Sequence, residues 1–218
     1  MNADLESDPL KTRCLPDSLC LKLPASLVEW DRSTRVSCHK SMEAHPKSVE
    51  ALRWLVEKPP GISLMAVLFL LLFWRLFRWP KLRPGEILRK LIYLVVGAGL
   101  SDLLASSLKV AIGRLKPHVT FYNPNVLPAL SLPSNHAFNT AFICVWFCLE
   151  SARLQEKFTG ARFIFVSFLF ALVAFIDVSR MVLGQHYPLD VIGGNIGGTL
   201  FALIYSFLVS RVRSTKPL

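Results

Sequence analysis

The chain has 218 residues, of which 52% are hydrophobic, and its formal net charge is +10. A hydrophobic share this high, gathered in long apolar runs, excludes an ordinary water-soluble domain. A charge of this size is also typical of nucleic-acid-binding proteins, but here the basic residues lie between apolar runs. The composition therefore favours a membrane protein whose partner is the bilayer and argues against a nucleic-acid partner.

The first sixty residues are polar and neutral, with nine Lys or Arg residues and nine Asp or Glu residues. We expect a tail that is mobile up to about residue 45 and has no signal peptide, because acidic residues stand where such a peptide is basic. In residues 48–57 the apolar residues recur at helical spacing on one face, and the charged residues lie on the opposite face. This pattern predicts a short amphipathic helix on the bilayer surface. We therefore divide the chain into this tail (1–60) and a membrane domain (61–218).

Five apolar segments follow the tail and predict membrane spans. They are residues 62–79, 91–108, 136–149, 163–178 and 189–209. A sixth span would have to come from the N-terminal tail. We expect an all-α fold, an integral membrane helical bundle with five to six transmembrane helices.

The loops between these spans carry their charge unevenly. Loops 75–90 and 153–162 and the C-terminus hold twelve Lys or Arg residues, whereas the opposite face holds four. Because cytoplasmic loops are enriched in Lys and Arg, the first set predicts the cytoplasmic face. The four exceptions on the other face are Lys109, Arg114, Lys116 and Arg180.

Two smaller patterns predict packing rather than chemistry. Four glycines between residues 193 and 198 lie inside an apolar helix, which favours close helix packing over a phosphate-binding loop. Asp102 and Asp177 are expected to be structural partners of cations or backbone groups rather than catalysts. The five cysteines have no zinc-site spacing, so we expect neither a structural disulfide nor a metal site.

Three segments on the outer face carry the residues that point to chemistry. Lys109–Pro117 ends one span, Pro133–His136 begins the next, and Ser179–Asp190 joins the last two. In the third segment His186 is followed four positions later by Asp190, a spacing that lets the carboxylate orient the imidazole. Four cations and two histidines with one local acid describe a pocket for a dianion such as phosphate.

These residues supply a phosphoryl-transfer scheme that needs no metal or other cofactor. His186, oriented by Asp190, is a candidate nucleophile, and His136 is a candidate acid for the departing oxygen and base for water. Side chains and backbone N–H groups at a helix start complete a phosphate cradle. The candidate phosphate-binding residues are Lys109, Arg114, Lys116, Ser134, Asn135 and Arg180.

In this order and spacing, the three segments resemble the signatures of the type 2 phosphatidic acid phosphatase superfamily. Those signatures are Lys-x6-Arg-Pro, Pro-Ser-Gly-His and Ser-Arg-x5-His-x3-Asp, and the third is matched at every fixed position. The second has Asn135 in place of glycine, and the first has Lys116 in place of arginine. The resemblance covers about residues 62–210.

The resemblance implies a metal-independent lipid phosphatase that acts at the outer leaflet. It implies His186 as the phosphohistidine nucleophile, Asp190 as its partner and His136 as the acid and base. Phosphate binding would fall to Lys109, Lys116, Ser134 and Arg180, with the backbone amide of Asn135.

We therefore expect an enzyme of the inner membrane whose site faces the periplasm. Undecaprenyl diphosphate, phosphatidylglycerol phosphate, phosphatidic acid and the 1-phosphate of lipid A are equally compatible substrates. We also consider two alternative hypotheses. One is a non-catalytic carrier of anions or lipid phosphates, and the other is a relative of the vanadium-dependent haloperoxidases, which share the phosphate pocket.

Overall fold

The computed structural model describes residues 24–43, 45–57, 84–117, 130–154 and 160–214, and within them the chain is helical. The helices are α1 (Ala25–Glu43), α2 (Pro46–Glu57), α4 (Pro84–Ile112), α5 (Asn135–Leu154), α6 (Gly160–Val182) and α7 (Pro188–Ser214). In these described ranges the one pairing of extended backbone is a single antiparallel bridge between Leu115 and Leu130. The predicted all-α fold is confirmed.

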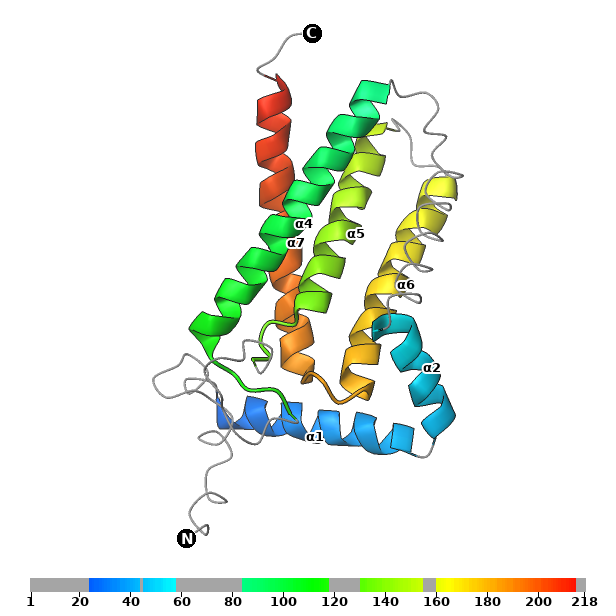
Figure 1. Ribbon diagram of the computed structural model, residues 1–218, viewed down its shortest axis with the longest axis vertical. Helices are drawn as coiled ribbons and strands as arrows, with labels where there is room; N and C mark the ends of the chain where they lie inside the picture. Colours follow the sequence, from blue (N-terminus) through cyan, green and yellow to red (C-terminus); the bar gives the residue numbers. More distant parts are fainter. Residues whose placement is uncertain (1–23, 44, 58–83, 118–129, 155–159, 215–218) are drawn as a thin grey trace.

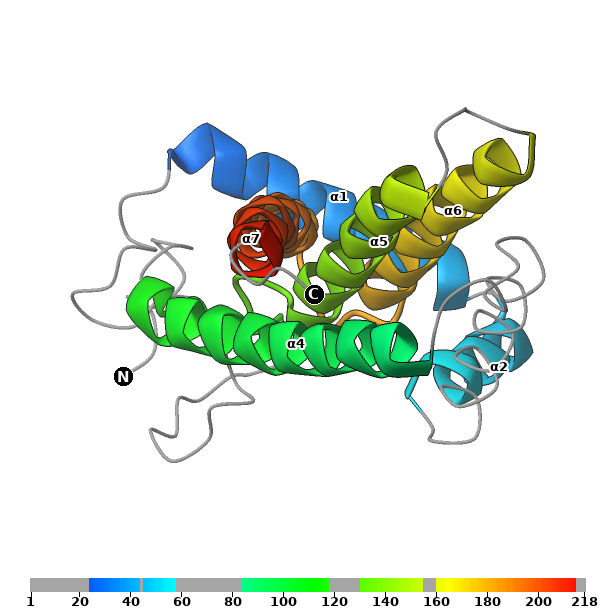
Figure 2. The ribbon, with the colours of Figure 1, turned by 90° about the horizontal axis from the view of Figure 1, so that it is seen from above.

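Helices α4 to α7 form an up-and-down bundle, and α1 crosses beneath its lower end (Figure 1). Helix α5 is the interior helix, because it packs against α4, α6 and α7 (Figure 2). The last turns of α4 and α6 and the first turns of α5 and α7 share the end where α1 lies. This arrangement gathers all three predicted chemical segments at one end of the bundle.

Three helices are long and apolar enough to cross a membrane. They are Gly85–Ile112, Phe163–Val182 and Pro188–Arg211. They contain the predicted spans 91–108, 163–178 and 189–209. Large apolar side chains on their outer faces are exposed, among them Val95 (70%), Leu103 (63%) and Phe170 (72%), as suits contact with lipid.

The expected count of five to six spans is not confirmed. The predicted span 136–149 does form a helix, α5, but Asn135, His136 and Asn139 make its first turns polar, and it is not among the three. Its aromatic side chains face inward, with Phe142 and Trp146 almost wholly buried against α6 and α7. The predicted span 62–79 lies outside the described residues.

The glycines of α7 bring that helix unusually close to α5. A Cβ atom on Gly198 would lie 2.1 Å from the backbone oxygen of Phe138, and one on Gly194 would lie 2.8 Å from the backbone oxygen of Ser134. No side chain fits at such distances. The prediction that these glycines serve close helix packing is confirmed.

The N-terminal region is more ordered than the sequence analysis expected. Residues 25–43, assigned there to a mobile tail, form α1 and pack against α6 and α7. The amphipathic helix predicted at 48–57 corresponds to α2. Its position on the bilayer surface and the boundary near residue 60 stay predictions.

The contact between α5 and α7 can be tested at Gly198. We expect Gly198→Ala to lower the free energy of unfolding by about 1–3 kcal/mol, because the new methyl group meets a backbone oxygen that has no room to move. Thermal unfolding in detergent measures the change. Gly99→Ala in α4 is the matched control, since nothing lies within 4 Å of its Cβ position, and we expect it to be neutral or slightly stabilising. Equal destabilisation by both substitutions would contradict this packing.

Candidate functional site

The site lies at the end of the bundle that α1 crosses. His186 stands in the turn between α6 and α7, with only 2% of its surface exposed. Gly184, at φ 68°, allows the chain to reverse in this turn. The imidazole Nδ1 lies 3.3 Å from Oδ2 of Asp190. The Asp190 carboxylate accepts a hydrogen bond from the imidazole tautomer that carries its proton on Nδ1. In that tautomer the lone pair of Nε2 is free.

The surroundings of His186 favour the neutral ring. Burial lowers the pKa of the imidazole below its ordinary value, and the nearby cations Lys109 and Arg180 lower it further. The hydrogen bond and negative charge of Asp190 oppose this shift without overcoming it. The unprotonated imidazole is therefore the main form near neutral pH.

Asp190 is held by the start of α7. It is the third residue of that helix, and its Oδ2 accepts a hydrogen bond of 2.9 Å from the backbone N–H of Tyr187. A carboxylate in this position reaches back to cap the helix start. Its own backbone oxygen accepts from the N–H of Ser134 at 2.8 Å. The first turns of α5 and α7 are thereby tied together.

Arg114 lies between two buried carboxylates. It follows Gly113 (φ 68°), which ends α4, and it is 3% exposed. Its Nη1 donates to Oδ1 of Asp190 at 3.0 Å, and its Nη2 donates to Oδ2 of Asp31. Burial alone would lower the pKa of Arg114, but the two carboxylates raise it. Both terminal nitrogens thus face carboxylates, whereas the sequence analysis placed Arg114 among the phosphate-binding residues.

Asp31 is the site residue that the sequence analysis missed. It comes from α1 and is wholly buried, and its Oδ1 accepts a hydrogen bond of 2.7 Å from the N–H of Leu189. Burial raises the pKa of its carboxyl group, and Arg114 and the N–H of Leu189 counteract that shift. No local pattern marks it, because its partner Arg114 lies 83 positions further along the chain.

The remaining cations gather around His136, which is exposed at the start of α5. His136 interacts electrostatically with Arg180, His186, Lys109 and Lys116. Lys109 also donates to the backbone oxygen of Leu130 at 3.4 Å, and Arg180 donates to the side-chain oxygen of Gln185. The structure therefore brings the two histidines and the three cations together.

Ser134 and Asn135, at the start of α5, differ in how their side chains are used. The hydroxyl of Ser134 is buried and has no hydrogen-bond partner in the part of the chain that the structure describes. The Asn135 amide instead donates to Asp102 at 2.9 Å and to Ser106 at 3.2 Å. Asp102 thus ties α4 to α5, and Asp177 likewise accepts from the Asn195 amide at 2.5 Å. These partners are side-chain amides, whereas the sequence analysis expected cations or backbone groups.

The sequence profile of the PAP2 superfamily matches residues 90–213, more than half of the chain. The chain belongs to the PAP2 superfamily. This membership confirms the resemblance drawn from the three signatures. Together with the three helices of membrane-spanning length, it makes the chain an integral membrane protein.

Two Rhizobium proteins named lipid A 1-phosphatase, from Rhizobium johnstonii and Rhizobium etli, are each 29% identical to the chain over 127 residues. The match covers 55% of this chain and 48% and 50% of those proteins, so the chain spans about half the length of these curated relatives. The fold is similar to that of a transmembrane PAP2 type phosphatidylglycerolphosphate phosphatase from Bacillus subtilis. That similarity has a TM-score of 0.63 at 16% identity and covers 91% of this chain and 93% of that one.

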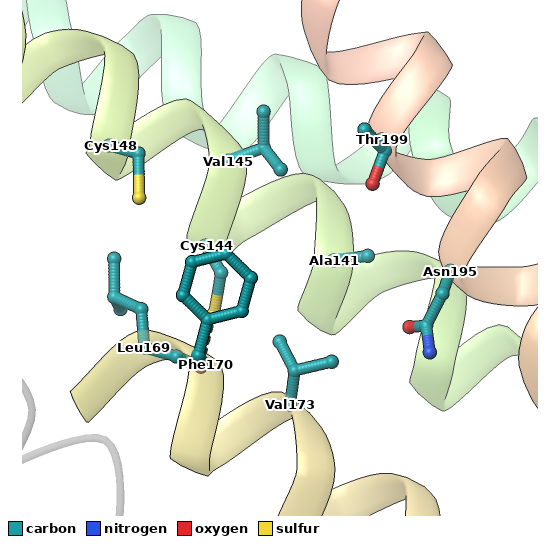
Figure 3. Close-up of a pocket in the computed structure, with 9 residues that line it drawn as sticks. All are labelled: Ala141, Cys144, Val145, Cys148, Leu169, Phe170, Val173, Asn195 and Thr199. Atoms are coloured by element: carbon teal, nitrogen blue, oxygen red, sulfur yellow. Dashed lines mark hydrogen bonds between the residues drawn. The ribbon is translucent and has the colours of Figure 1, made fainter. Parts of the chain in front are cut away.

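The PAP2 bundle also contains a cavity of about 250 Å³ between α5, α6 and α7. Its lining is mostly apolar, with Cys144, Leu169 and Val173 on one side and Asn195 on the other (Figure 3). Asn195 is five residues beyond Asp190, which is about 7 Å along the helix axis. The cavity therefore begins about one and a half helical turns inward from the site.

The protonation state of His186 in this PAP2 site can be measured directly. We expect its imidazole to titrate below the ordinary value of about 6.5. The neutral form should accordingly persist as the pH falls to about 6.5 and be lost only at lower pH. Nitrogen NMR of the histidine rings in detergent micelles reports this, with His186→Ala assigning the signal. A ring that titrates at or above 6.5 would contradict the described environment.

Proposed function

We propose that the chain is a membrane lipid phosphatase that works through a phosphohistidine on His186. The observation that carries this proposal is the buried pair of His186 and Asp190, 3.3 Å apart, at the bundle end where Lys109, Lys116 and Arg180 gather. A nucleophile held by a buried carboxylate, beside cations suited to a dianion, is the arrangement that phosphoryl transfer requires.

The proposed reaction has two steps. Nε2 of His186 attacks phosphorus in line, forming the N–P bond as the bond to the lipid oxygen breaks, while His136 donates a proton to that oxygen. His136 then removes a proton from water, whose oxygen attacks the phosphohistidine and breaks the N–P bond. Inorganic phosphate leaves and both histidines are restored.

The groups around the phosphate divide the remaining work. Lys109, Lys116 and Arg180 balance the charge on its non-bridging oxygens. The hydroxyl of Ser134, which has no hydrogen-bond partner among the described residues, and the backbone N–H of Asn135 would donate to one of them. A buried polar group without a partner calls for an explanation, and a phosphate oxygen provides one.

A lipid substrate is favoured over a soluble ester. The site opens at the end of a bundle with exposed apolar flanks, and the apolar cavity lies inward from it between the helices that carry the site. A phosphate bound at the site would leave an acyl or prenyl chain to run along these helices. We rank the 1-phosphate of lipid A first among the candidate substrates, because the two Rhizobium relatives are named lipid A 1-phosphatase. Phosphatidylglycerol phosphate, phosphatidic acid and undecaprenyl diphosphate are the other candidates.

We further propose that the site faces the periplasm from the inner membrane. The described cations Lys90 and Arg153, which pair with Glu150 at the opposite end of the bundle, belong to the basic cytoplasmic set.

Phosphate release from purified protein in detergent micelles tests the proposed activity. We expect turnover of at least one of the four lipid phosphates, a much slower reaction with p-nitrophenyl phosphate, and loss of activity to background in His186→Ala. Gln substitution of the exposed Glu29 in α1 is the control that should keep full activity.

Two outcomes would count against this assignment. Turnover that survives in His186→Ala would rule out His186 as the nucleophile. Tight binding of a lipid phosphate without release of phosphate, equal in both proteins, would instead indicate a carrier.

A further inference from the structure

We propose that Asp31, supplied by the surface helix α1, is a positioning residue of the active site. It acts through Arg114 on Asp190 and thereby on His186. This inference rests on the proposed function, because its readout is the phosphatase reaction. It adds to that function a dependence of the nucleophile on a helix outside the bundle.

The first support is the burial of Asp31. The remainder of α1 is largely polar, and its neighbours Glu29 and Arg32 are exposed, yet Asp31 has no exposed surface. A carboxylate is rarely buried unless its partners are also buried. Both of its oxygens are engaged, Oδ1 with the N–H of Leu189 and Oδ2 with Arg114. Asp31 therefore points inward, at the site, while α1 lies on the surface.

The second support is the start of α7, where Asp190 caps the N–H of Tyr187 but no side chain of α7 accepts from the first N–H inside the helix. The residue before the helix is Tyr187, which has no short polar side chain to accept from the first turn. Pro188 has no N–H, so Leu189 presents the first one. Asp31 accepts it at 2.7 Å. The α7 helix is thus capped by a carboxylate from α1, one residue before Asp190.

The third support is the sharing of one guanidinium by two carboxylates. Arg114 binds Asp31 through one terminal nitrogen and Asp190 through the other, and its Cζ atom lies 4.1 Å from the ring centre of Tyr187. Arg35, one turn further along α1, lies over the same ring at 5.9 Å. Asp31 therefore holds Arg114 against Oδ1 of Asp190. The other oxygen, Oδ2, is then available to His186.

The charge of Asp31 also reaches His186. The ring is surrounded by Asp190 from α7, Lys109 from α4, Arg180 from α6 and His136 from α5. Asp31 offsets the positive charge of Arg114. Without Asp31, the positive charge of Arg114 is no longer offset. Asp190 then stabilises the protonated imidazole of His186 less. The pKa of His186 should then fall further.

The test compares Asp31→Asn with Asp31→Ala. Asparagine keeps an oxygen that can cap Leu189 but removes the charge, so we expect kcat to fall about 10- to 100-fold with little change in KM. The acidic limb of the pH profile of kcat/KM should move to lower pH. Alanine removes both the cap and the charge, and should add a loss of thermal stability. Glu29→Gln, on the exposed face of the same helix, should match the unmodified protein.

A double-mutant cycle separates positioning from a merely structural role. If Asp31 acts through Arg114, then Asp31→Asn should cost little more in an Arg114→Gln background than Arg114→Gln alone. Additive losses, or an Asp31→Asn protein that melts earlier but keeps its acidic limb, would overturn the inference. An inactive unmodified protein would instead overturn the proposed function. If the unmodified protein is active and Asp31→Asn leaves its kcat and pH profile unchanged, only the role of Asp31 is overturned.

Discussion

The described site depends on one buried cation, the guanidinium of Arg114, held between the carboxylates of Asp190 and Asp31. Burying charge is unfavourable unless partners are in place, and removing one member of such a group typically destabilises a protein by about 3–5 kcal/mol. The three residues come from α1, the end of α4 and the start of α7. None of these elements can move without exposing an unpaired charge to the interior, so the position of the His186 imidazole is set by three distant parts of the chain at once.

A second constraint sets where the two histidines meet. The glycines of α7 let its backbone touch that of α5, and the N–H of Ser134 donates to the backbone oxygen of Asp190. Side chains at Gly194 and Gly198 would push these helix starts apart. The distance between His136 and His186 therefore follows from backbone packing, while the orientation of each ring follows from local hydrogen bonds. This division explains why glycines in an apolar helix matter to a site that they do not touch.

Much of this site was predictable from the sequence, because its signals are local. The ordered signatures carry His136, His186 and Asp190, and the uneven loop charge placed Lys109, Lys116 and Arg180 on one face. The two carboxylate partners of Arg114 were not foreseen, since charge alone does not tell whether a cation faces a ligand or an internal carboxylate. Asp31 could not be found, because its burial arises only when α1 folds against α6 and α7. Helix α5 was predicted as a span, but it is not among the three described helices that are long and apolar enough to cross a membrane, and its first turns are polar.

The central claim is that His186 forms a covalent bond to phosphorus. Rapid quenching of the purified protein with a radiolabelled lipid phosphate, followed by peptide mapping under alkaline conditions, tests it most directly. The account predicts an acid-labile phosphoryl group on the peptide that contains His186. Turnover without any labelled peptide, or label on a different residue, would contradict the account.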